Sequence, residues 1–224
     1  MRRGCLTVSE AIPIAGRTWI WNGTGVSSLS ELFGLIASED HAAAETVLAS
    51  SPSLVTVGLA RPDEFFLEAR GAQVYEGDTA LHIASFSHDT ELTSKLLGRG
   101  ADVRARNRRG AEPLHSAMVG GPGLASWKPA RQQDVIVCLV EAGADPNAKA
   151  LGGVTPLHRA VRNRCSGAVE VLLRLGADPR ITNDSGSAAI DLAQWTTGRG
   201  GTGTAEAKAE QHAIIGLLRE VAGN

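Results

Sequence analysis

The tetrapeptide Thr155-Pro156-Leu157-His158 decides the fold of this 224-residue chain, because close copies of it recur along the sequence. The copies are Thr79-Ala80-Leu81-His82, Glu112-Pro113-Leu114-His115 and a degraded Ala188-Ala189-Ile190-Asp191. Their spacings are 33, 43 and 33 residues, and a Gly-Ala-Asp triplet that begins at Gly100, Gly143 and Gly176 keeps the 43- and 33-residue intervals. Two independent markers that move in step indicate a tandem array, which buries its core between neighbouring units and leaves a long open surface.

A second pattern supports the array, since apolar residues recur five times at positions i, i+1, i+4 and i+5. Residues with this spacing lie on one stripe of an α-helix, so each such helix is expected to face the layers before and behind it. The five copies are Ala43/Ala44/Val47/Leu48, Leu92/Thr93/Leu96/Leu97, Val135/Ile136/Leu139/Val140, Ala168/Val169/Leu172/Leu173 and Ala213/Ile214/Leu217/Leu218.

Together these motifs resemble the ankyrin-repeat pattern over roughly residues 30–224, with a TPLH-type start of the first helix, an apolar second helix and a GAD turn. The resemblance implies an all-α solenoid of helix-turn-helix units joined by short hairpin fingers. It also implies that His82, His115 and His158 tie fingers to helices by hydrogen bonds. Glu112 departs from the usual Thr and Asp191 from the usual His, but both substitutions leave the core register intact.

The motif positions predict how the chain is divided. We expect an N-terminal arm at residues 1–28, poorly ordered or packed at an edge, and a solenoid at 29–224. Within the solenoid we expect a capping repeat at 29–55 with Ser30 as its N-cap, a finger insertion at 56–76, repeats at 77–110, 111–153 and 154–186, and a C-terminal capping repeat at 187–224.

Three insertions interrupt the 33-residue period. The first adds about 16 residues and includes 62–68; the second adds ten residues between His115 and Val135; the third adds 12 residues around 196–208. The two later insertions fall between the first and second helices of a unit, so they should emerge on the edge opposite the fingers. They are either a working face or loop growth that costs little entropy.

Composition and cysteine usage favour a soluble chain in a reducing compartment. The sequence is 43% hydrophobic with a formal net charge of −2, and Cys5, Cys138 and Cys165 are odd in number without paired spacing. We expect free thiols, with Cys138 as an ordinary small buried residue, and a cytoplasmic location. A signal peptide is not expected, because polar and charged residues interrupt every apolar run in the N-terminal segment. No apolar stretch approaches the length that a membrane-spanning helix needs.

Sequence motifs for catalysis, cofactors and metals are mostly missing. Gly198-Arg199-Gly200-Gly201-Thr202-Gly203 fits G-x-G-x-x-G, but the preceding segment 190–195 reads as a helix, whereas the dinucleotide motif follows a strand. A flexible loop is therefore favoured there, and an enzyme or nucleotide binder that uses this loop remains the weaker alternative. We expect no catalytic residue, no cofactor and no metal, because the three repeat histidines stand on helices about 8 to 10 Å apart.

Charge is distributed unevenly along the chain. Net charge is −5 over residues 1–80, +5 over 81–180 and −2 over 181–224. In the basic middle, Arg104, Arg106, Arg108 and Arg109 occupy one finger, and Arg159, Arg162 and Arg164 follow the next first helix. Guanidinium groups bind carboxylates well, which favours an acidic protein surface as partner; a simply solvated Arg face is the alternative. Nucleic acid is not expected, since the isoelectric point is about 6.3 and no nucleic-acid motif occurs.

The resemblance also implies which residues meet a partner, because ankyrin repeats use finger tips and the ends of their first helices, which line a concave face. Aromatic residues beside Arg resemble the composition of interface hot spots. Trp195, however, could instead pack beneath the third insertion. The matching positions are Tyr75, Glu76, Asp78, Phe86, Arg106, Arg108, Arg109, Val119, Leu151, Val154, Arg162, Asn163, Thr182, Asp184 and Trp195.

The sequence thus predicts a non-catalytic module that binds a protein partner through its concave face, with no membrane and no small-molecule substrate. An alternative is a stoichiometric inhibitor or protective partner of an enzyme, in which Trp127 or the pair Phe65-Phe66 would plug a cleft.

Overall fold

The computed structural model describes residues 28–124, 127–195 and 204–222. Except for Ser28, the expected N-terminal arm lies outside these residues, and so do Cys5 and the Gly-rich loop at 198–203.

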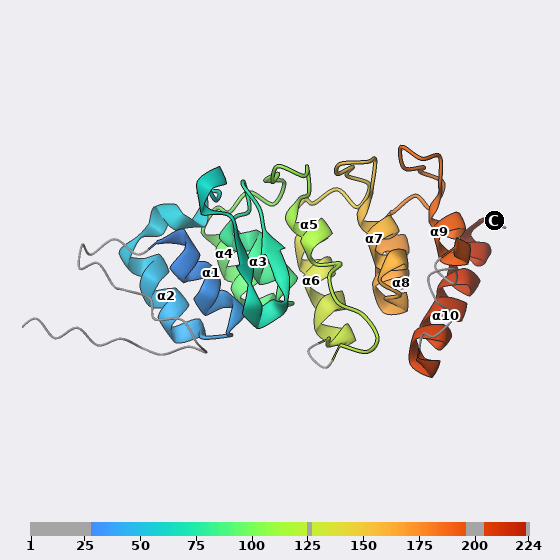
Figure 1. The fold of residues 1–224 in the computed structure, drawn as a ribbon, viewed down its shortest axis with the longest axis horizontal. Coiled ribbons are helices and arrows are strands. Elements are labelled where there is room, and N and C mark those ends of the chain that lie inside the picture. Colours follow the sequence, from blue (N-terminus) through green and yellow to red (C-terminus); the bar gives the residue numbers. More distant parts are fainter. Residues whose placement is uncertain (1–27, 125–126, 196–203, 223–224) are drawn as a thin grey trace, which may run out of the picture.

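Helices pair into units that stack in line, which confirms the expected helical solenoid (Figure 1). The fingers that join successive units run along one edge of the stack, and the first helices line one side of it. The pairs are α1 (Leu29–Ala37) with α2 (His41–Ser50), α3 (Ala80–Phe86) with α4 (Thr90–Gly98), α5 (Pro113–Ser116) with α6 (Pro129–Glu141), α7 (Pro156–Arg162) with α8 (Ser166–Arg174), and α9 (Ala189–Trp195) with α10 (Ala205–Ala222).

Capping residues set where several helices begin. The side chain of Ser28 accepts a hydrogen bond from Glu31 N at 3.1 Å, and Glu31 closes a capping box with it. The prediction that Ser30 is the N-cap was therefore wrong, because Ser28 already satisfies the free amide. Asp40 and Asp89 cap α2 and α4 in the same way, through Ala43 N and Leu92 N.

The TPLH-type histidines tie each unit to the next finger, as the resemblance implied. In the fourth unit, His158 Nδ1 accepts from Thr155 N at 3.2 Å, so the ring proton stands on Nε2 and is donated to Ser187 O at 3.1 Å. His82 and His115 repeat this pattern on the carbonyls of Ala111 and Val154, each at 3.1 Å. Among the described residues, no group of three or more His, Cys, Asp or Glu is arranged to hold a metal ion.

The second helices supply the core that the apolar pattern predicted. Leu96 in α4, Ile136 and Leu139 in α6, and Leu172 in α8 are fully buried between layers. Each such side chain contributes about 1.5 to 3 kcal/mol on burial, so the stripes hold the stack together. Ala213 is an exception, because it lies on the exposed side of α10 while Ile214 and Leu218 face the core.

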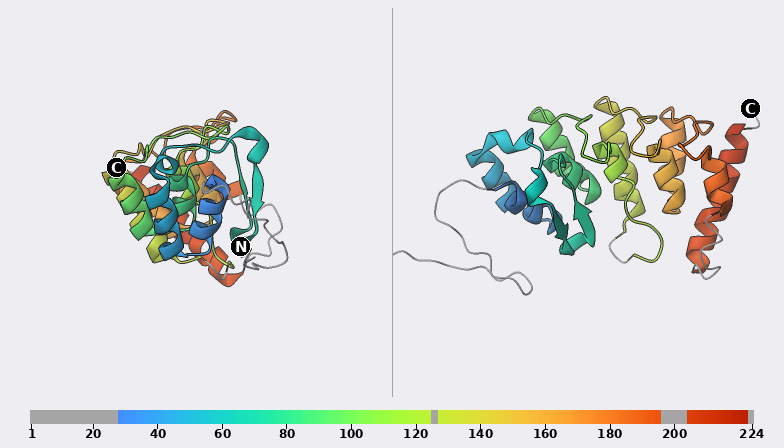
Figure 2. Two further views of the ribbon diagram at one scale, coloured as in Figure 1. Left: turned by 90° about the vertical axis from the view of Figure 1, so that its left-hand side faces the viewer. Right: turned by 45° about the horizontal axis from the view of Figure 1, so that its top comes forward.

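The first insertion folds back on the stack, which the sequence did not predict. After 3-10 turns at Pro52–Val55 and Arg61–Asp63, the antiparallel strands β1 (Phe65–Leu67) and β2 (Ala72–Val74) flank a third such turn at Glu68–Arg70. The hairpin lies on the side of α1 away from α2 (Figure 2). Phe65 stacks on Phe33 of α1, and Arg70 Nε donates to Ala37 O at 2.9 Å. Because a two-stranded hairpin is marginal alone, this packing is what orders it.

The second insertion emerges between α5 and α6, on the edge opposite the fingers as expected (Figure 1). It is anchored by the Trp127 indole, whose Nε1 donates to Gln132 Oε1 at 3.0 Å, while Gln132 Nε2 donates to Ala117 O at 2.9 Å. The corresponding expectation for the third insertion falls on 196–203, outside the described residues.

The two described cysteines are free thiols in different surroundings. Cys165 is buried, and burial raises the pKa of its thiol to about 12. Cys138 is only half-buried, which corrects the expectation of a buried residue, because its side chain lies at the margin of the α6 stripe. Within the described ranges, no helix combines the length and apolar character needed to cross a membrane.

Candidate functional site

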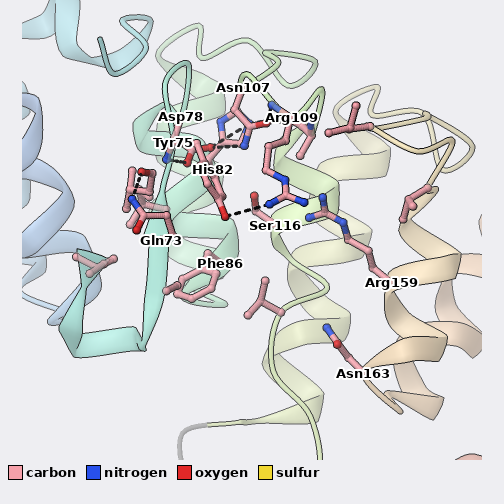
Figure 3. A pocket seen from close by; sticks show the side chains of 18 of the residues that line it. Gln73, Tyr75, Asp78, His82, Phe86, Asn107, Arg109, Ser116, Arg159 and Asn163 are labelled. Carbon is pink, nitrogen blue, oxygen red and sulfur yellow. Dashed lines mark hydrogen bonds and ion pairs between the residues drawn. The ribbon is translucent and has the colours of Figure 1, made fainter. Parts of the chain in front are cut away.

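A hollow of about 400 Å³ runs along the first helices from the β hairpin to α7; we call it the helix-one groove (Figure 3). Its walls come from β2, the fingers before α5 and α7, and the helices α3, α5 and α7. Nine of the predicted partner-binding residues line it, although they come from three units: Tyr75, Asp78, Phe86, Arg109, Val119, Leu151, Val154, Arg162 and Asn163.

Equivalent positions of successive units form two rows in the groove, and the chemistry changes along each row. The row that follows each TPLH-type histidine passes from Ile83 to Ser116 to Arg159. The row three residues later passes from Phe86 to Val119 to Arg162. The groove is therefore apolar at α3 and basic at α7.

Tyr75 holds two guanidinium groups at the finger edge of the groove. The Cζ atoms of Arg108 and Arg109 lie 5.0 Å and 5.3 Å from the centre of its ring, within the range of cation–π attraction. Arg109 Nη1 also donates to the Tyr75 hydroxyl at 3.2 Å, which orients Arg109 along the groove. Arg108 is additionally ion-paired with Glu64 of the first insertion, and it is not among the residues that line the groove.

Arg159 is the half-buried charge at the α7 end of the groove. Its Nη1 donates to His115 O at 3.2 Å, and Figure 3 shows its guanidinium pointing toward that of Arg109. Burial lowers the pKa of Arg159, and repulsion from Arg109 and then Arg162 lowers it further, while attraction by Asp78 offsets part of the effect.

Asp78 is the only carboxylate among the described residues that line the groove, and it is already engaged. It is 5% exposed, Oδ2 accepts from Tyr75 N at 2.7 Å, and Oδ1 accepts from Asn107 Nδ2 at 2.8 Å. These bonds fix the base of the finger. Asp78 is therefore a structural residue in this chain, unlike the exposed contact residue that the sequence predicted.

Three other predicted residues lie at the groove's margin, where ion pairs within the chain hold them. Arg106 Nη2 lies 2.9 Å from Glu112 Oε1, and Arg108 pairs with Glu64. Glu76 Oε2 lies 3.4 Å from Arg61 Nε. The basic finger is thus divided, because only Arg109 of this group turns its side chain into the groove.

The predicted residues of the last finger are not part of the groove. Thr182 and Asp184 are exposed, and Asp184 N donates to Gly152 O at 2.9 Å, which joins two fingers. Trp195 is the final residue of α9, and its side chain is outside what the structure describes. The expectation that it contributes to the same face stays untested.

Ten groove residues were missing from the predicted set, and three of them, Gln73, Ser116 and Arg159, are polar residues that are not fully buried. Ser116 and Arg159 could have been found, because both follow a TPLH-type histidine and share a helical face with the predicted positions three residues later. Gln73 had no signal in the sequence, since it reaches the groove only because the hairpin folds back.

The aromatic residues proposed as plugs differ in how exposed they are and in which contacts they make within the chain. The indole of Trp127 is half-buried and hydrogen-bonded to Gln132, and Phe65 is stacked on Phe33. Phe66, the middle residue of β1, and Leu124, in the second insertion, are instead 56% and 57% exposed. An inhibitor that used these insertions would act through Phe66 or Leu124, because Trp127 is needed to hold its own loop.

Comparisons with known proteins find the same repeat in two parts of the chain. The family described as "Ankyrin repeat" matches residues 76–108, and the family described as "Ankyrin repeats (many copies)" matches residues 139–193. These segments contain the fingers and helices that line most of the groove.

Several curated proteins are similar over about half of the chain. Ankyrin repeat and SOCS box protein 16 of Mus musculus is 40% identical over 116 residues, which is 51% of this chain and 25% of that protein. Neurogenic locus notch homolog protein 1 of Danio rerio is 34% identical over 118 residues, 52% of this chain and 4% of that protein. Tyrosine-protein kinase Shark of Drosophila melanogaster is 32% identical over 124 residues, 55% of this chain and 12% of that protein. The similar segment is thus a quarter or less of each relative.

Proposed function

The chain belongs to the ankyrin-repeat family, whose members are generally protein-protein interaction modules, and from this premise we propose that it binds a protein partner through the helix-one groove. One observation carries the proposal. The groove combines side chains from three successive units, and their mixture of aromatic, apolar and Arg residues is typical of interface centres.

The partner that we propose presents an acidic surface. Arg109, Arg159 and Arg162 all line the groove, whereas the carboxylate of Asp78 is committed to the finger. Nucleic acid is no part of the proposal, because the other end of the groove is apolar at Phe86 and Val119 and offers no row of basic residues to a phosphate backbone.

We further propose that binding is stoichiometric and non-catalytic. The family is generally non-catalytic, and the buried histidines of this chain are committed to backbone hydrogen bonds. The loop at 198–203 follows the helix α9 and not a strand, which removes the context that a dinucleotide would require. A reducing, cytoplasmic location is proposed on the free thiols Cys138 and Cys165.

The division into repeats at 77–110, 111–153 and 154–186 also remains a proposal, supported by one helix pair in each segment.

Capture from cell lysate tests the proposal if a groove variant is compared with a matched variant elsewhere. The groove variant is Leu151→Asp with Arg162→Glu, at an exposed finger residue and in the last turn of α7. Its control is Val221→Asp with Arg174→Glu, which makes the same changes of charge at an exposed position of α10 and in the last turn of α8.

We expect the native chain and the control to retain one partner at near one-to-one ratio, and the groove variant to lose most of it. Circular dichroism should show all three chains equally folded, because the changed residues are exposed. Equal capture by the groove variant and the control would contradict the proposal.

A further inference from the structure

The charges in the helix-one groove do not balance. Of the described residues that line it, Arg109, Arg159 and Arg162 carry positive charge, and none of these three forms an ion pair with another described residue. Asp78 is the single carboxylate in this lining, and its two oxygens accept hydrogen bonds from Tyr75 N and Asn107 Nδ2. The free protein therefore holds three like charges around one hollow without a committed counter-charge.

The position of Arg159 makes this imbalance informative. A half-buried guanidinium is costly unless it is paired, and this one donates to a single neutral acceptor, His115 O at 3.2 Å. A guanidinium has five N–H donors, so most of its donors remain for a ligand. Figure 3 shows Arg109 and Arg159 pointing toward one another, although their like charges repel. An oxyanion between them would relieve the repulsion and accept from both.

We propose that Arg109, Arg159 and Arg162 form a subsite for the carboxylate of an Asp or Glu side chain carried on an extended peptide segment of the partner; this rests on the function proposed above. Tyr75 acts as a positioning residue, because its ring and hydroxyl hold Arg109 at the edge of the subsite. Asn163 also lines the groove, and its Nδ2 donates a hydrogen bond to Met118 O.

The other end of the groove indicates a peptide and not a free anion. Phe86 and Val119 offer an apolar surface at α3 and α5, where a bulky apolar side chain can be buried. Helix axes pack about 8 to 10 Å apart, so α3 and α7 are separated by roughly 16 to 20 Å. An extended chain rises about 3.3 Å per residue, which places the apolar residue about five or six positions from the acidic one.

A selection experiment tests the subsite without knowledge of the natural partner. The full chain is used to select from a phage-displayed library of random peptides of about 12 residues, long enough to span the groove when extended. The same selection is run on Arg162→Gln, on Arg109→Gln and on the control Arg174→Gln, an exposed residue of α8 away from the groove. Arg159→Gln is added as a further variant, because its bond to His115 O also has a structural role.

The native chain and the control are expected to enrich peptides with Asp or Glu at a fixed distance from a bulky apolar residue. The Arg162→Gln and Arg109→Gln chains, each with one of the three guanidinium groups removed, should show a weaker acidic preference and keep the apolar one. One enriched peptide is then synthesised with Glu, Gln or phosphoserine at the acidic position, and its affinity is measured by fluorescence anisotropy. Replacing Glu by Gln should weaken binding to the native chain about tenfold or more, as expected for charge-assisted hydrogen bonds, and should weaken binding to Arg162→Gln by a clearly smaller factor, because one of the three guanidinium groups is gone.

The outcomes separate this proposal from the function on which it rests. Peptides that bind in the groove without an acidic preference would overturn the carboxylate subsite and leave partner binding standing. Phosphoserine binding that is more than tenfold tighter than Glu binding would replace the carboxylate by a phosphate. No enrichment from the library would overturn the extended peptide ligand, and the lysate capture described above decides the proposed function independently.

Discussion

His115 gives the sharpest prediction about stability, because its ring is held neutral inside the stack. Nδ1 accepts from Glu112 N at 3.2 Å and Nε2 donates to Val154 O at 3.1 Å. A second proton on Nδ1 would face a backbone N–H that can only donate. Burial first, and then repulsion from Arg159, lowers the pKa of His115 to about 3, against about 6.5 in an unfolded chain.

The sign of the pH dependence follows from these two values. The unfolded chain binds a proton below pH about 6.5, whereas folded His115 stays neutral down to about 3. The stability linked to His115 is therefore fully present above pH 6.5 and is lost as the pH falls toward 3. The loss is about 1.4 kcal/mol per pH unit, or about 2 kcal/mol between pH 6.5 and pH 5. Burial also lowers the pKa of His82, His88 and His158, so they act in the same direction.

Substitution of His115 by Gln isolates its share of the effect. Urea unfolding followed by circular dichroism between pH 7 and pH 5 should show that His115→Gln loses about 2 kcal/mol less on acidification than the native chain. Its stability at pH 7 should itself be about 1 to 3 kcal/mol lower, because Glu112 N and Val154 O lose a partner. Burial raises the pKa of Glu112, but both chains carry this group, so its contribution largely cancels in the comparison.

His212→Gln is the matched control, because it makes the same substitution at an exposed residue of α10. Nuclear magnetic resonance supplies a second readout through the ring protons of His115 in the folded native chain. A titration midpoint for His115 near 6.5, or the same pH dependence in His115→Gln and the native chain, would refute the reasoning.

The remaining predictions concern backbone strain and thiol reactivity. Gly153 has φ +67°, and a Cβ there would lie 2.9 Å from Asp184 N. Gly153→Ala should therefore lower the free energy of unfolding, measured in urea, by about 1 to 3 kcal/mol. Gly98→Ala, at the last residue of α4 with open space around it, should instead stabilise the chain by about 0.5 to 1 kcal/mol; equal effects of the two changes would count against the finger geometry. In native buffer, Cys138 should react with iodoacetamide faster than Cys165, whose pKa is raised to about 12 by burial, with modification followed by peptide mass spectrometry. Reaction of Cys165 at the rate of Cys138 would show that the α7–α8 core opens readily.

The sequence by itself determined the repeat, its register and most of its core. The motif at Thr155-Pro156-Leu157-His158 starts a helix in each of its copies, and in the three copies that carry a histidine the ring donates to a carbonyl of the next finger. These features are local or reach only one unit along the chain, so a periodic sequence records them directly. Nine of the residues predicted from the same repeat positions line the groove.

Tertiary structure alone decided which charges face the groove and where it ends. Arg108 does not line the groove, because it forms an ion pair with Glu64, which lies in an insertion outside the repeat pattern. The hairpin closes one end of the groove because the Phe65 ring stacks on Phe33 of α1. Such contacts join segments that share no periodicity, and their energies depend on geometry in space. A sequence pattern predicts which side chains share one face of a helix. It does not predict which residues an inserted loop contacts when it folds back.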